Sequence, residues 1–590
     1  MTMETTGQTH SDARRLHWLA LLLLIVAPYF VFSPALSFEF VGIDDGMNIY
    51  ENQDVRALDW PHLQAMFTNV QRAQRYMPLG WMSYAVDQHF FGLNPFTYHL
   101  GNYLLHTLNG LLVFLLLRRL LQAAAGRAAL EENPVAGTVA PFLGALWWAW
   151  HPLRVEPVAW SSARIYLVAS AFFFWSVLAY LRGAQEESDG RAGGRWRGLA
   201  VLAFAASLLT YPVAIFGVCA FVLLEIYPLR RISLRAPWRM PAAVRNGLLP
   251  LALVAGLLFG LMLLCKAGLP QQLQSLDPPR HFGTLAHKFM QAFYVWMYFV
   301  WKPFFPLGLA PEYPTLLSFQ PFTPPFVLSL LGMVFLSVVL FWRRHQWTAV
   351  WVAWLAHLAL LTPLLGVVEL RYHPGDRYSY IVGVIPAALL VGAAWRWRQT
   401  RWRRIGWAAG FAVVLAFGAM SAKQLFVWRD PVSLRRCIAE RAEGSFYRSY
   451  AQAMLGATYY DAGSNGPAVS ACQTALAGTN NTPALQSFAL RTLGNVAQAE
   501  HRLEDAVAFY DQALGLDARP LETRINRGIA LGKLGRLAEA EAAFRELVRA
   551  EPGHAGAQQN LSMVLELQGR TNEAALARAG QWPSAKSDGL

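Results

Sequence analysis

The sequence predicts an all-α protein in two parts, a polytopic helical membrane domain followed by a solenoid of short helix pairs. The chain has 590 residues, of which 55% are hydrophobic, and it contains 22 Trp and 35 Phe. That composition is too apolar for an ordinary soluble enzyme. The apolar residues gather in runs long enough to cross a bilayer core of about 30 Å. From about residue 445, a pattern with a 34-residue period replaces these runs.

Eleven apolar runs are the predicted membrane spans. The first is long and is followed by no evident small-residue cleavage motif, so we expect a retained helix rather than a signal peptide. The spans lie near residues 17–36, 98–117, 139–151, 160–181, 198–210, 212–228, 247–265, 326–342, 347–366, 379–395 and 404–421.

Arginine clusters predict the orientation of these spans. The net charge is +13, and the arginines of the first 425 residues sit mainly in short segments between apolar runs. Such segments are typical of cytoplasmic loops, so residues 1–15 are predicted to be cytoplasmic. Because membrane topology explains the positions of these arginines, the positive charge does not indicate nucleic-acid binding. We expect membrane lipid and no nucleic acid as a partner.

With eleven crossings of a bacterial inner membrane, the C-terminus lies in the periplasm. This count requires that residues 285–307, which contain Lys302-Pro303 and Pro306, form a re-entrant or interfacial helix. The alternative, a twelfth crossing at that segment, would place the C-terminus inside the cell.

The periplasmic face of the membrane domain, residues 16–425, carries the candidate catalytic residues. Its longest outer segment is loop 37–97, in which Asp44 and Asp45 follow the first span. Adjacent carboxylates at a membrane surface are costly unless they are solvated or used. One of them is therefore a candidate general base or metal ligand. The alternative is a helix cap followed by a polar first turn.

Six basic side chains are predicted at or near outer span ends on the same face. A phosphate at the membrane surface needs such partners, and Arg can hold it through two parallel hydrogen bonds. Each one taken alone is equally well explained by snorkelling to lipid headgroups. The six candidate phosphate ligands are His151, Arg154, Arg164, Lys302, Arg371 and Arg377.

Residues 445–580 are predicted to form tetratricopeptide repeats. The 34-residue period brings small residues and aromatic residues back at fixed positions. These recurring residues are Ala506, Ala540 and Ala574, with Tyr510 and Phe544 between them. A linker at 426–444 would join the repeats to the membrane domain, and 581–590 would be a tail.

Stacked helix pairs of this kind form a curved solenoid with a concave groove. Asn526 and Asn560 share one repeat position on its inner face. Their amides are candidates for holding the backbone of an extended protein acceptor or partner. The alternative is that both are ordinary solvated helix residues.

The sequence gives little indication of a metal site or of disulfide bonds. No metal-ligand spacing occurs, so no cofactor is predicted, although a divalent cation beside the two aspartates stays open. Cys219 and Cys265 fall in apolar runs. Cys437 and Cys472 lie in the C-terminal region, where an oxidising compartment would allow them to pair.

Several motifs in order carry a resemblance to a known family. They are Gln74-Arg75-Tyr76-Met77-Pro78-Leu79-Gly80-Trp81, Asn94-Pro95-Phe96-Thr97-Tyr98-His99-Leu100, His151-Pro152-Leu153-Arg154-Val155-Glu156-Pro157-Val158-Ala159-Trp160 and Asp376-Arg377-Tyr378-Ser379-Tyr380. In this order, and with terminal repeats, the chain resembles the transmembrane and tetratricopeptide-repeat O-mannosyltransferases and their bacterial relatives, which have the GT-C fold.

The resemblance implies a GT-C-like membrane enzyme. It would be an inverting glycosyltransferase that moves mannose or another hexose from a polyprenyl-phosphate sugar to a Ser or Thr hydroxyl of periplasmic proteins. Asp44 or Asp45 would match the family's catalytic carboxylate, and the repeats would hold the acceptor protein.

The chain also departs from the family pattern. Bacterial relatives typically have Ser-Glu-Arg-Lys-Asp where this chain has Ser162-Ala163-Arg164-Ile165-Tyr166, and Lys-Pro where it has Tyr211-Pro212. Four charged positions are thus neutral. Two alternatives remain: a transferase acting on a glycan or lipid, and a non-catalytic membrane scaffold whose repeats assemble an envelope complex.

Overall fold

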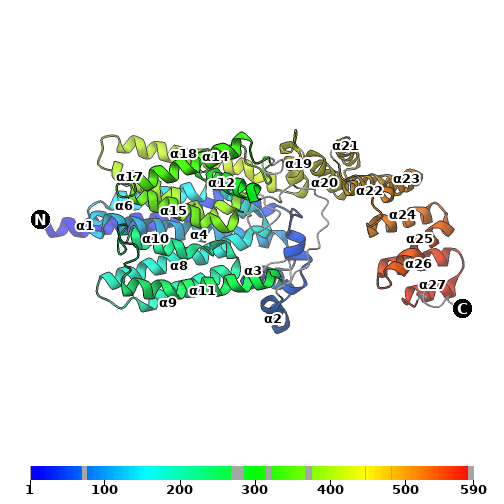
Figure 1. Cartoon of the computed structure of the whole chain (residues 1–590), viewed down its shortest axis with the longest axis horizontal. Helices are drawn as coiled ribbons and strands as arrows, with labels where there is room; N and C mark the ends of the chain where they lie inside the picture. Colours follow the sequence, from blue (N-terminus) through cyan, green and yellow to red (C-terminus); the bar gives the residue numbers. More distant parts are fainter. Residues whose placement is uncertain are drawn as a thin grey trace. The chain divides into compact units, whose positions relative to one another are not determined.

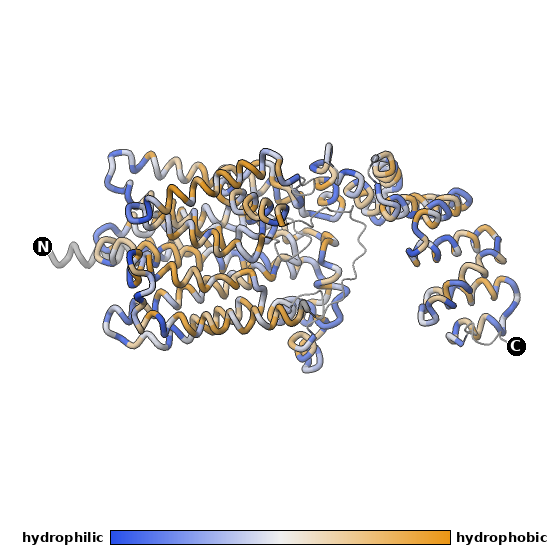
Figure 2. The backbone as a smooth tube through the Cα atoms, viewed as in Figure 1, coloured by the Kyte–Doolittle hydropathy of each residue, from blue (hydrophilic) through white to orange (hydrophobic). Residues whose placement is uncertain are grey.

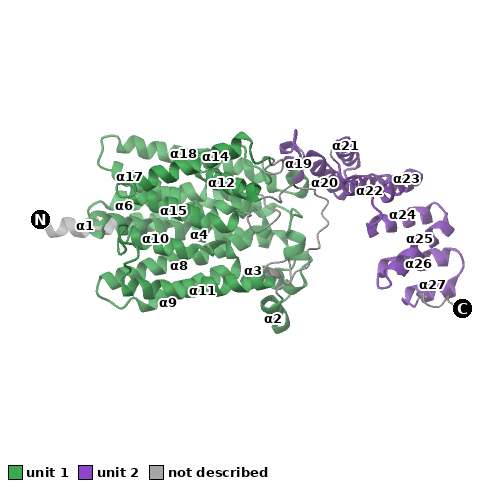
Figure 3. Ribbon diagram, in the orientation of Figure 1, with its two compact units in different colours: residues 1–271, 282–434 green, residues 272–281, 435–590 purple. Residues whose placement is uncertain are grey.

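The computed structural model describes residues 2–69, 76–267, 285–313, 320–365, 375–445, 447–479 and 481–581, with side chains from residue 14 onward. It divides into two compact units (Figure 3), one formed by residues 1–271 and 282–434 and the other containing residues 435–590. Helices make up both units, and the described residues contain no strand. The predicted all-α class is therefore confirmed.

The membrane unit is a bundle of apolar helices (Figure 1). Hydrophobic residues follow the helices and hydrophilic residues gather at their ends (Figure 2). Its main helices are α1 (Thr2–Phe32), α4 (Pro95–Ala125), α6 (Pro134–Ala149), α8 (Arg164–Ser188), α9 (Gly194–Thr210), α10 (Gly217–Ile226), α11 (Ala242–Ala267), α12 (Leu285–Trp301), α14 (Pro324–Trp342), α15 (Thr348–Leu361), α17 (Val384–Trp397) and α18 (Arg403–Leu425).

Each of the eleven predicted spans overlaps at least one helix of this unit. Among the described residues, six helices are long and apolar enough to cross a membrane. A seventh is counted if the short helix before Gly383 and α17, which meet at 48°, form one bent span. Several apolar helices, α6, α10 and α15, are shorter. The structure thus indicates a membrane protein, while the total of eleven crossings stays a prediction.

Local sequence explains where the helices begin and end. At α4, the Asn94 side chain accepts a hydrogen bond from the backbone N–H of Phe96 at 3.2 Å, and Pro95 occupies the first helical position. Both features favour a helix start. Gly126, with φ 91°, follows the last residue of α4 and ends it.

Helices α4, α6 and α8 form the centre of the membrane unit, and α17 packs on α6. Close approach of α6 and α17 depends on Gly144, because a Cβ there would lie 2.5 Å from the Val391 side chain. Two polar contacts join segments within this core: the His106 ring is 2.8 Å from the Tyr380 hydroxyl, and Asn109 donates to the Leu167 carbonyl at 2.9 Å.

The described part of the predicted outer loop 37–97 contains several short helices. These are η2 (Gly46–Tyr50), η3 (Gln53–Val55), α2 (Trp60–Thr68) and α3 (Pro78–Phe91), and η1 (Ser33–Ser37) directly precedes the loop. Figure 1 shows α2 and α3 at one end of the bundle. The aspartate pair lies directly before η2, so this segment positions the candidate catalytic residues.

The second unit consists of helix pairs, as the 34-residue period predicts. After α19 (Pro431–Arg441) its helices are α20 (Arg448–Asp461), α21 (Asn465–Leu476), α22 (Pro483–Ala499), α23 (Leu503–Leu516), α24 (Leu521–Lys533), α25 (Leu537–Ala550), α26 (Ala555–Leu567) and α27 (Thr571–Arg578). The division between the two units falls within the segment 426–444, which contains α19.

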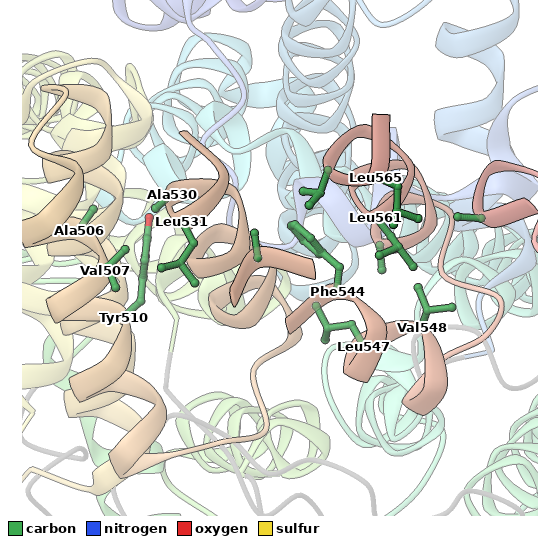
Figure 4. Packing of buried hydrophobic residues seen from close by; sticks show 14 of the residues in the cluster. Ala506, Val507, Tyr510, Ala530, Leu531, Phe544, Leu547, Val548, Leu561 and Leu565 are labelled. Atoms are coloured by element: carbon green, nitrogen blue, oxygen red, sulfur yellow. The ribbon is translucent and has the colours of Figure 1, made fainter. Parts of the chain in front are cut away.

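Recurring aromatic and small residues hold the repeat helices together. Tyr510 and Phe544 are both at most 1% exposed and belong to one continuous apolar cluster (Figure 4). A Cβ on Gly494 would lie 2.5 Å from the Tyr510 ring, and one on Gly528 would lie 2.6 Å from the Phe544 ring. The small residue at this position therefore makes room for the aromatic ring of the next helix.

All four cysteines are free thiols. Cys472 is buried in the apolar cluster of the first repeats, while Cys437 belongs to α19. The pairing of Cys437 with Cys472 that the sequence left open does not occur in this structure.

Candidate active site

The candidate active site is a cavity of about 120 Å³ in the membrane unit. Segments far apart in the sequence supply its walls: the start of η2, the start of α8, the turn after α9, the end of α15 and the turn before α17. The described lining residues are Asp44, Asn48, Trp160, Ser162, Ile165, Tyr166, Tyr211, Pro212, Val213, Pro363, Leu364, Arg377 and Tyr378.

Asp45 anchors the first wall of this cavity. Its side chain is fully buried and accepts hydrogen bonds from the backbone N–H of Val41 at 2.9 Å, the backbone N–H of Ser162 at 3.1 Å and the Ser162 hydroxyl at 2.5 Å. The Trp160 indole also donates to the Ile43 carbonyl at 2.9 Å. These bonds fix the aspartate segment to the residues before α8.

Burial raises the pKa of the Asp45 carboxyl to about 6, although the hydrogen bonds from Ser162 and Val41 act in the opposite direction. Asp44 adds a smaller upward contribution through its negative charge. A carboxyl with this pKa is mainly ionised at neutral pH and takes up a proton under mildly acidic conditions.

Asp44 lies beside Asp45 in a different environment. It is half-buried and lines the cavity, whereas Asp45 is not among the lining residues. Its backbone has φ 56°, in the left-handed region that L-residues other than Gly seldom adopt. The Asp44 carbonyl accepts from the Asn48 N–H at 2.9 Å, which holds this conformation in the turn that opens η2. Backbone strain of this kind clusters at functional sites.

Asn48 contributes an unpaired polar atom to the same cavity. The residue is 2% exposed, and its Oδ1 has no hydrogen-bond partner in the structure. A buried carbonyl oxygen without a partner is costly, and such an atom in a cavity wall is a typical contact for a ligand. Because it can only accept, it would suit a ligand hydroxyl or N–H group.

Arg377 is the predicted phosphate ligand that lines the cavity. It forms an ion pair with Glu156, which also accepts from the Arg377 backbone N–H at 2.9 Å. Its guanidinium lies 5.2 Å from the Trp160 ring centroid and 4.7 Å from that of Tyr378. A guanidinium held between aromatic rings and a carboxylate has a fixed position, which suits recognition of an oxyanion.

His151 and Lys302, two further predicted phosphate ligands, lie away from this cavity and have partners of their own. His151 Nε2 is 2.8 Å from the Pro303 carbonyl, and its Nδ1 accepts from the Leu153 N–H at 3.1 Å. Lys302 is 4% exposed and donates to the Leu307 carbonyl at 2.6 Å.

Arg164 and Arg154 are also buried outside the cavity lining. Arg164 pairs with Asp87 at 2.6 Å and donates to the carbonyls of Ser83 and Tyr98 at 3.0 and 2.6 Å. It therefore ties α3, α4 and α8 together. Arg154 is 1% exposed, lies 5.2 Å from the Trp148 ring centroid and 5.3 Å from that of Tyr380, and leaves its Nε and Nη1 without partners.

The remaining predicted site residues fall elsewhere. Arg371 lies outside the described residues. Asn526 and Asn560 lie in the repeat unit, where Asn526 donates to Asn495 Oδ1 at 3.0 Å and Asn560 donates to the Gly556 carbonyl at 2.8 Å. Within the described part of the chain, no three His, Cys, Asp or Glu side chains gather as a metal ion would require.

Sequence reasoning missed Asn48, Glu156 and the tyrosines of the cavity wall as site residues. Asn48 follows Asp44 by four residues, the spacing of side chains on one helical face, and this spacing was the available clue. Three of the four positions where the chain departs from the family pattern, Ile165, Tyr166 and Tyr211, line the cavity. The Tyr166 and Tyr211 hydroxyls lie 3.3 Å apart.

Comparison with known proteins finds one matching family model and two distantly similar proteins. A tetratricopeptide-repeat family model matches residues 521–554. The chain is 31% identical over 146 residues to protein O-mannosyl-transferase TMTC2 of Mus musculus and 29% identical over 147 residues to the Homo sapiens protein of the same name.

Each of these alignments covers 24% of this chain and 16% of the relative. The chain thus matches about a sixth of the length of these relatives. Together with the apolar helices, the comparisons support a membrane protein that carries a tetratricopeptide repeat and is distantly similar to protein O-mannosyltransferases.

Proposed function

We propose that this protein is a membrane glycosyltransferase that moves a sugar from a polyprenyl-phosphate sugar to a Ser or Thr hydroxyl of a protein acceptor. The observation that carries the proposal is the cavity in which Asp44, Asn48 and Arg377 meet. A carboxylate, an unpaired hydrogen-bond acceptor and a cation are the groups that such a transfer uses. The distant similarity to protein O-mannosyltransferases supports the same class of reaction.

The reaction would be a single displacement that inverts the anomeric carbon. A bond forms from the acceptor oxygen to this carbon while its bond to the phosphate oxygen breaks. Asp44 would take the proton of the attacking hydroxyl. Arg377 would stabilise the negative charge that develops on the departing phosphate.

Of the two predicted base candidates, Asp44 is favoured because it lines the cavity, whereas Asp45 is buried behind it. Asp45 would act as a positioning residue, since it holds the aspartate segment against Ser162. Asn48 Oδ1 would accept a hydrogen bond from a sugar hydroxyl. His151, Arg164 and Lys302 would support the fold rather than contact the phosphate, because each is buried and bonded to the protein. Arg154 is set aside because it does not line this cavity.

The repeat unit would bind the acceptor protein, which raises the acceptor's local concentration at the site. We further propose a GT-C fold, a bacterial inner-membrane location, and an active face and repeats in the periplasm. The arginine-rich loops between predicted spans support that orientation.

Glycopeptide mass spectrometry of envelope proteins tests the proposal. The strains compared carry the wild-type gene, a deletion, or the deletion complemented with Asp44→Asn. We expect a hexose-type modification that disappears in the deletion and stays at least about 100-fold reduced with Asp44→Asn, the loss typical of a removed general base. Asp59→Asn is the matched control, since Asp59 is an exposed helix cap in the same outer segment and Asn caps helices equally well.

Each outcome decides between the alternatives. Full restoration of the modification by Asp44→Asn at equal protein level would exclude Asp44 as the base, and Asp45→Asn would be examined next. An absence of any glycopeptide difference would favour a glycan or lipid acceptor. If glycans and lipids were also unchanged, a scaffold would be favoured, with the neutral positions Ile165 and Tyr211 in the cavity wall as its structural support.

A further inference from the structure

A second and larger cavity, of about 1400 Å³, lies within the membrane unit. Its walls come from the last half of α4, the middle of α8, α10 with residues 227–235, α15 and α17. Among the described residues, the two linings share no member. The larger cavity is therefore a separate space with its own chemistry.

The body of this cavity is apolar. Along α15 its lining residues run from Trp347 to Leu360, which corresponds to about 20 Å at about 1.5 Å per residue. Half of a bilayer core of about 30 Å is about 15 Å. The cavity is thus long enough for the acyl chains of a lipid from one leaflet, and Leu117, Phe174 and Ile385 are typical of the side chains that such chains would contact.

One end of the cavity is strongly basic. The lining residues that the structure describes include no carboxylate, and they include five arginines and one histidine: Arg230, Arg231, Arg235, Arg396, Arg398 and His345. Arg230, Arg231 and Arg235 follow α10, and His345 follows α14. Arg396 lies in the last turn of α17 and Arg398 directly after it, so separate parts of the chain converge on one charged rim.

Most of this charge is not neutralised by the protein. Arg231 is the exception, because it pairs with Glu225 at 2.5 Å and Glu187 at 2.7 Å. Arg230, Arg235 and Arg396 are exposed, and none of them takes part in an ion pair among the described residues. Arg398 donates to the Trp395 carbonyl at 2.7 Å, while its Nε is buried without a partner.

We propose that this cavity binds an acidic phospholipid, whose phosphate lies among Arg230, Arg235 and Arg396 and whose acyl chains lie along α15 and α17. A free phosphate would use the rim and leave about 20 Å of apolar wall uncovered. A zwitterionic lipid would bring its own cation among the arginines. An anionic headgroup with acyl chains matches both features. This proposal does not rest on the transferase activity.

Native mass spectrometry tests the proposal on the full chain purified in a neutral detergent. Phosphatidylglycerol, phosphatidylcholine and inorganic phosphate are titrated separately. We expect phosphatidylglycerol to bind at least about tenfold more tightly than phosphatidylcholine, since each arginine near an anionic headgroup contributes about fivefold in affinity. The combined variant Arg230→Ala, Arg235→Ala, Arg396→Ala should lose on the order of 100-fold in affinity for phosphatidylglycerol.

A matched control removes the same charge from exposed arginines that do not line the cavity, Arg239→Ala, Arg403→Ala and Arg404→Ala. Its affinity for phosphatidylglycerol should equal that of the wild type. A second variant, Ala356→Trp, fills the apolar body while keeping every arginine. It should also lose at least about tenfold in affinity for phosphatidylglycerol, as expected when a bulky side chain occupies the space of an acyl chain.

The proposal is overturned by equal binding of the two phospholipids or by a triple variant that binds like its control. Inorganic phosphate that displaces phosphatidylglycerol completely, together with unchanged binding by Ala356→Trp, would show an anion site at the rim and no lipid site. Circular dichroism measures the helix content of each variant and identifies one that fails to fold. If either the triple variant or Ala356→Trp fails to fold, the binding affinity of the other one tests the proposal.

Discussion

Asp44 and Asp45 show how two identical neighbours acquire different properties. Asp45 is enclosed by Val41 and Ser162 and leaves no surface to solvent, while Asp44 stays half-buried on the cavity wall with a left-handed backbone. A base must reach its substrate, and a positioning residue must be held by its neighbours. The two roles therefore follow from the surroundings of each carboxyl.

The raised pKa of Asp45 predicts a stability that depends on pH. Its pKa is about 6 in the folded protein and near its ordinary value of 3.8 when unfolded, so the folded state binds the proton more tightly. Stability attributable to this carboxyl should rise as pH falls from about 7 to 5, by on the order of 1–3 kcal/mol. Thermal unfolding of the wild type and Asp45→Asn at several pH values measures the difference. A difference that stays constant between pH 7 and 5 would contradict the assignment.

Glu156 and Arg377 form a buried ion pair, and removing one partner should be costly. Glu156 is 3% exposed, and Glu156→Ala would leave the Arg377 charge without its carboxylate. We expect a loss of about 3–5 kcal/mol in the free energy of unfolding. Glu500→Ala is the control, because its pair with Arg502 is exposed and should contribute at most about 1 kcal/mol. Denaturant unfolding measures both losses. Similar losses from the two substitutions would show that the buried pair stabilises the protein no more than an exposed pair does.

At the scale of elements, the repeat helices depend on the fit between a small residue and an aromatic ring. Gly528 and Gly532 both lie in α24, but a Cβ at Gly528 would lie 2.6 Å from the Phe544 ring, whereas the nearest atom at Gly532 is 3.9 Å away. The same substitution should therefore have opposite effects at the two positions.

We expect Gly528→Ala to destabilise the pair α24 and α25 by about 1–3 kcal/mol through overpacking. Gly532→Ala should stabilise it by up to about 1 kcal/mol, because Ala favours the helix and its Cβ would meet Val564 and Ala540 only at ordinary contact distance. Hydrogen exchange of the amides in α24 and α25, measured in the full chain, reports both changes. Equal protection in the two variants would show that the Phe544 ring moves aside without cost.

At the scale of the whole molecule, the proposed function requires a membrane topology that places the repeats and the active face in the same compartment. With eleven spans, a reporter fused after Gly580 should behave as periplasmic, and one inserted after Met240 should behave as cytoplasmic. Reporter activity in intact cells measures both. Cytoplasmic behaviour of the first fusion would contradict the eleven-span count and the proposal that the repeats and the active face share one compartment.

The sequence by itself determined the helices and the repeats. Apolar runs predicted the helices of the membrane unit, and the 34-residue period predicted Tyr510 and Phe544 at equivalent positions. These patterns are local: hydrophobic length and periodicity follow from neighbouring residues along one helix. The same local information singled out Asp44 and Asp45 as a pair, and it offered six cations as equivalent phosphate ligands.

Only the tertiary structure decided which of these residues meet. Asp45 is buried because Ser162, more than 100 residues away, covers it, and Arg377 reaches the cavity wall because Glu156 and Trp160 hold it there. Arg164 instead turns toward Asp87 and the α4 backbone. Burial and pairing depend on contacts between distant segments, and spacing along the chain does not encode them.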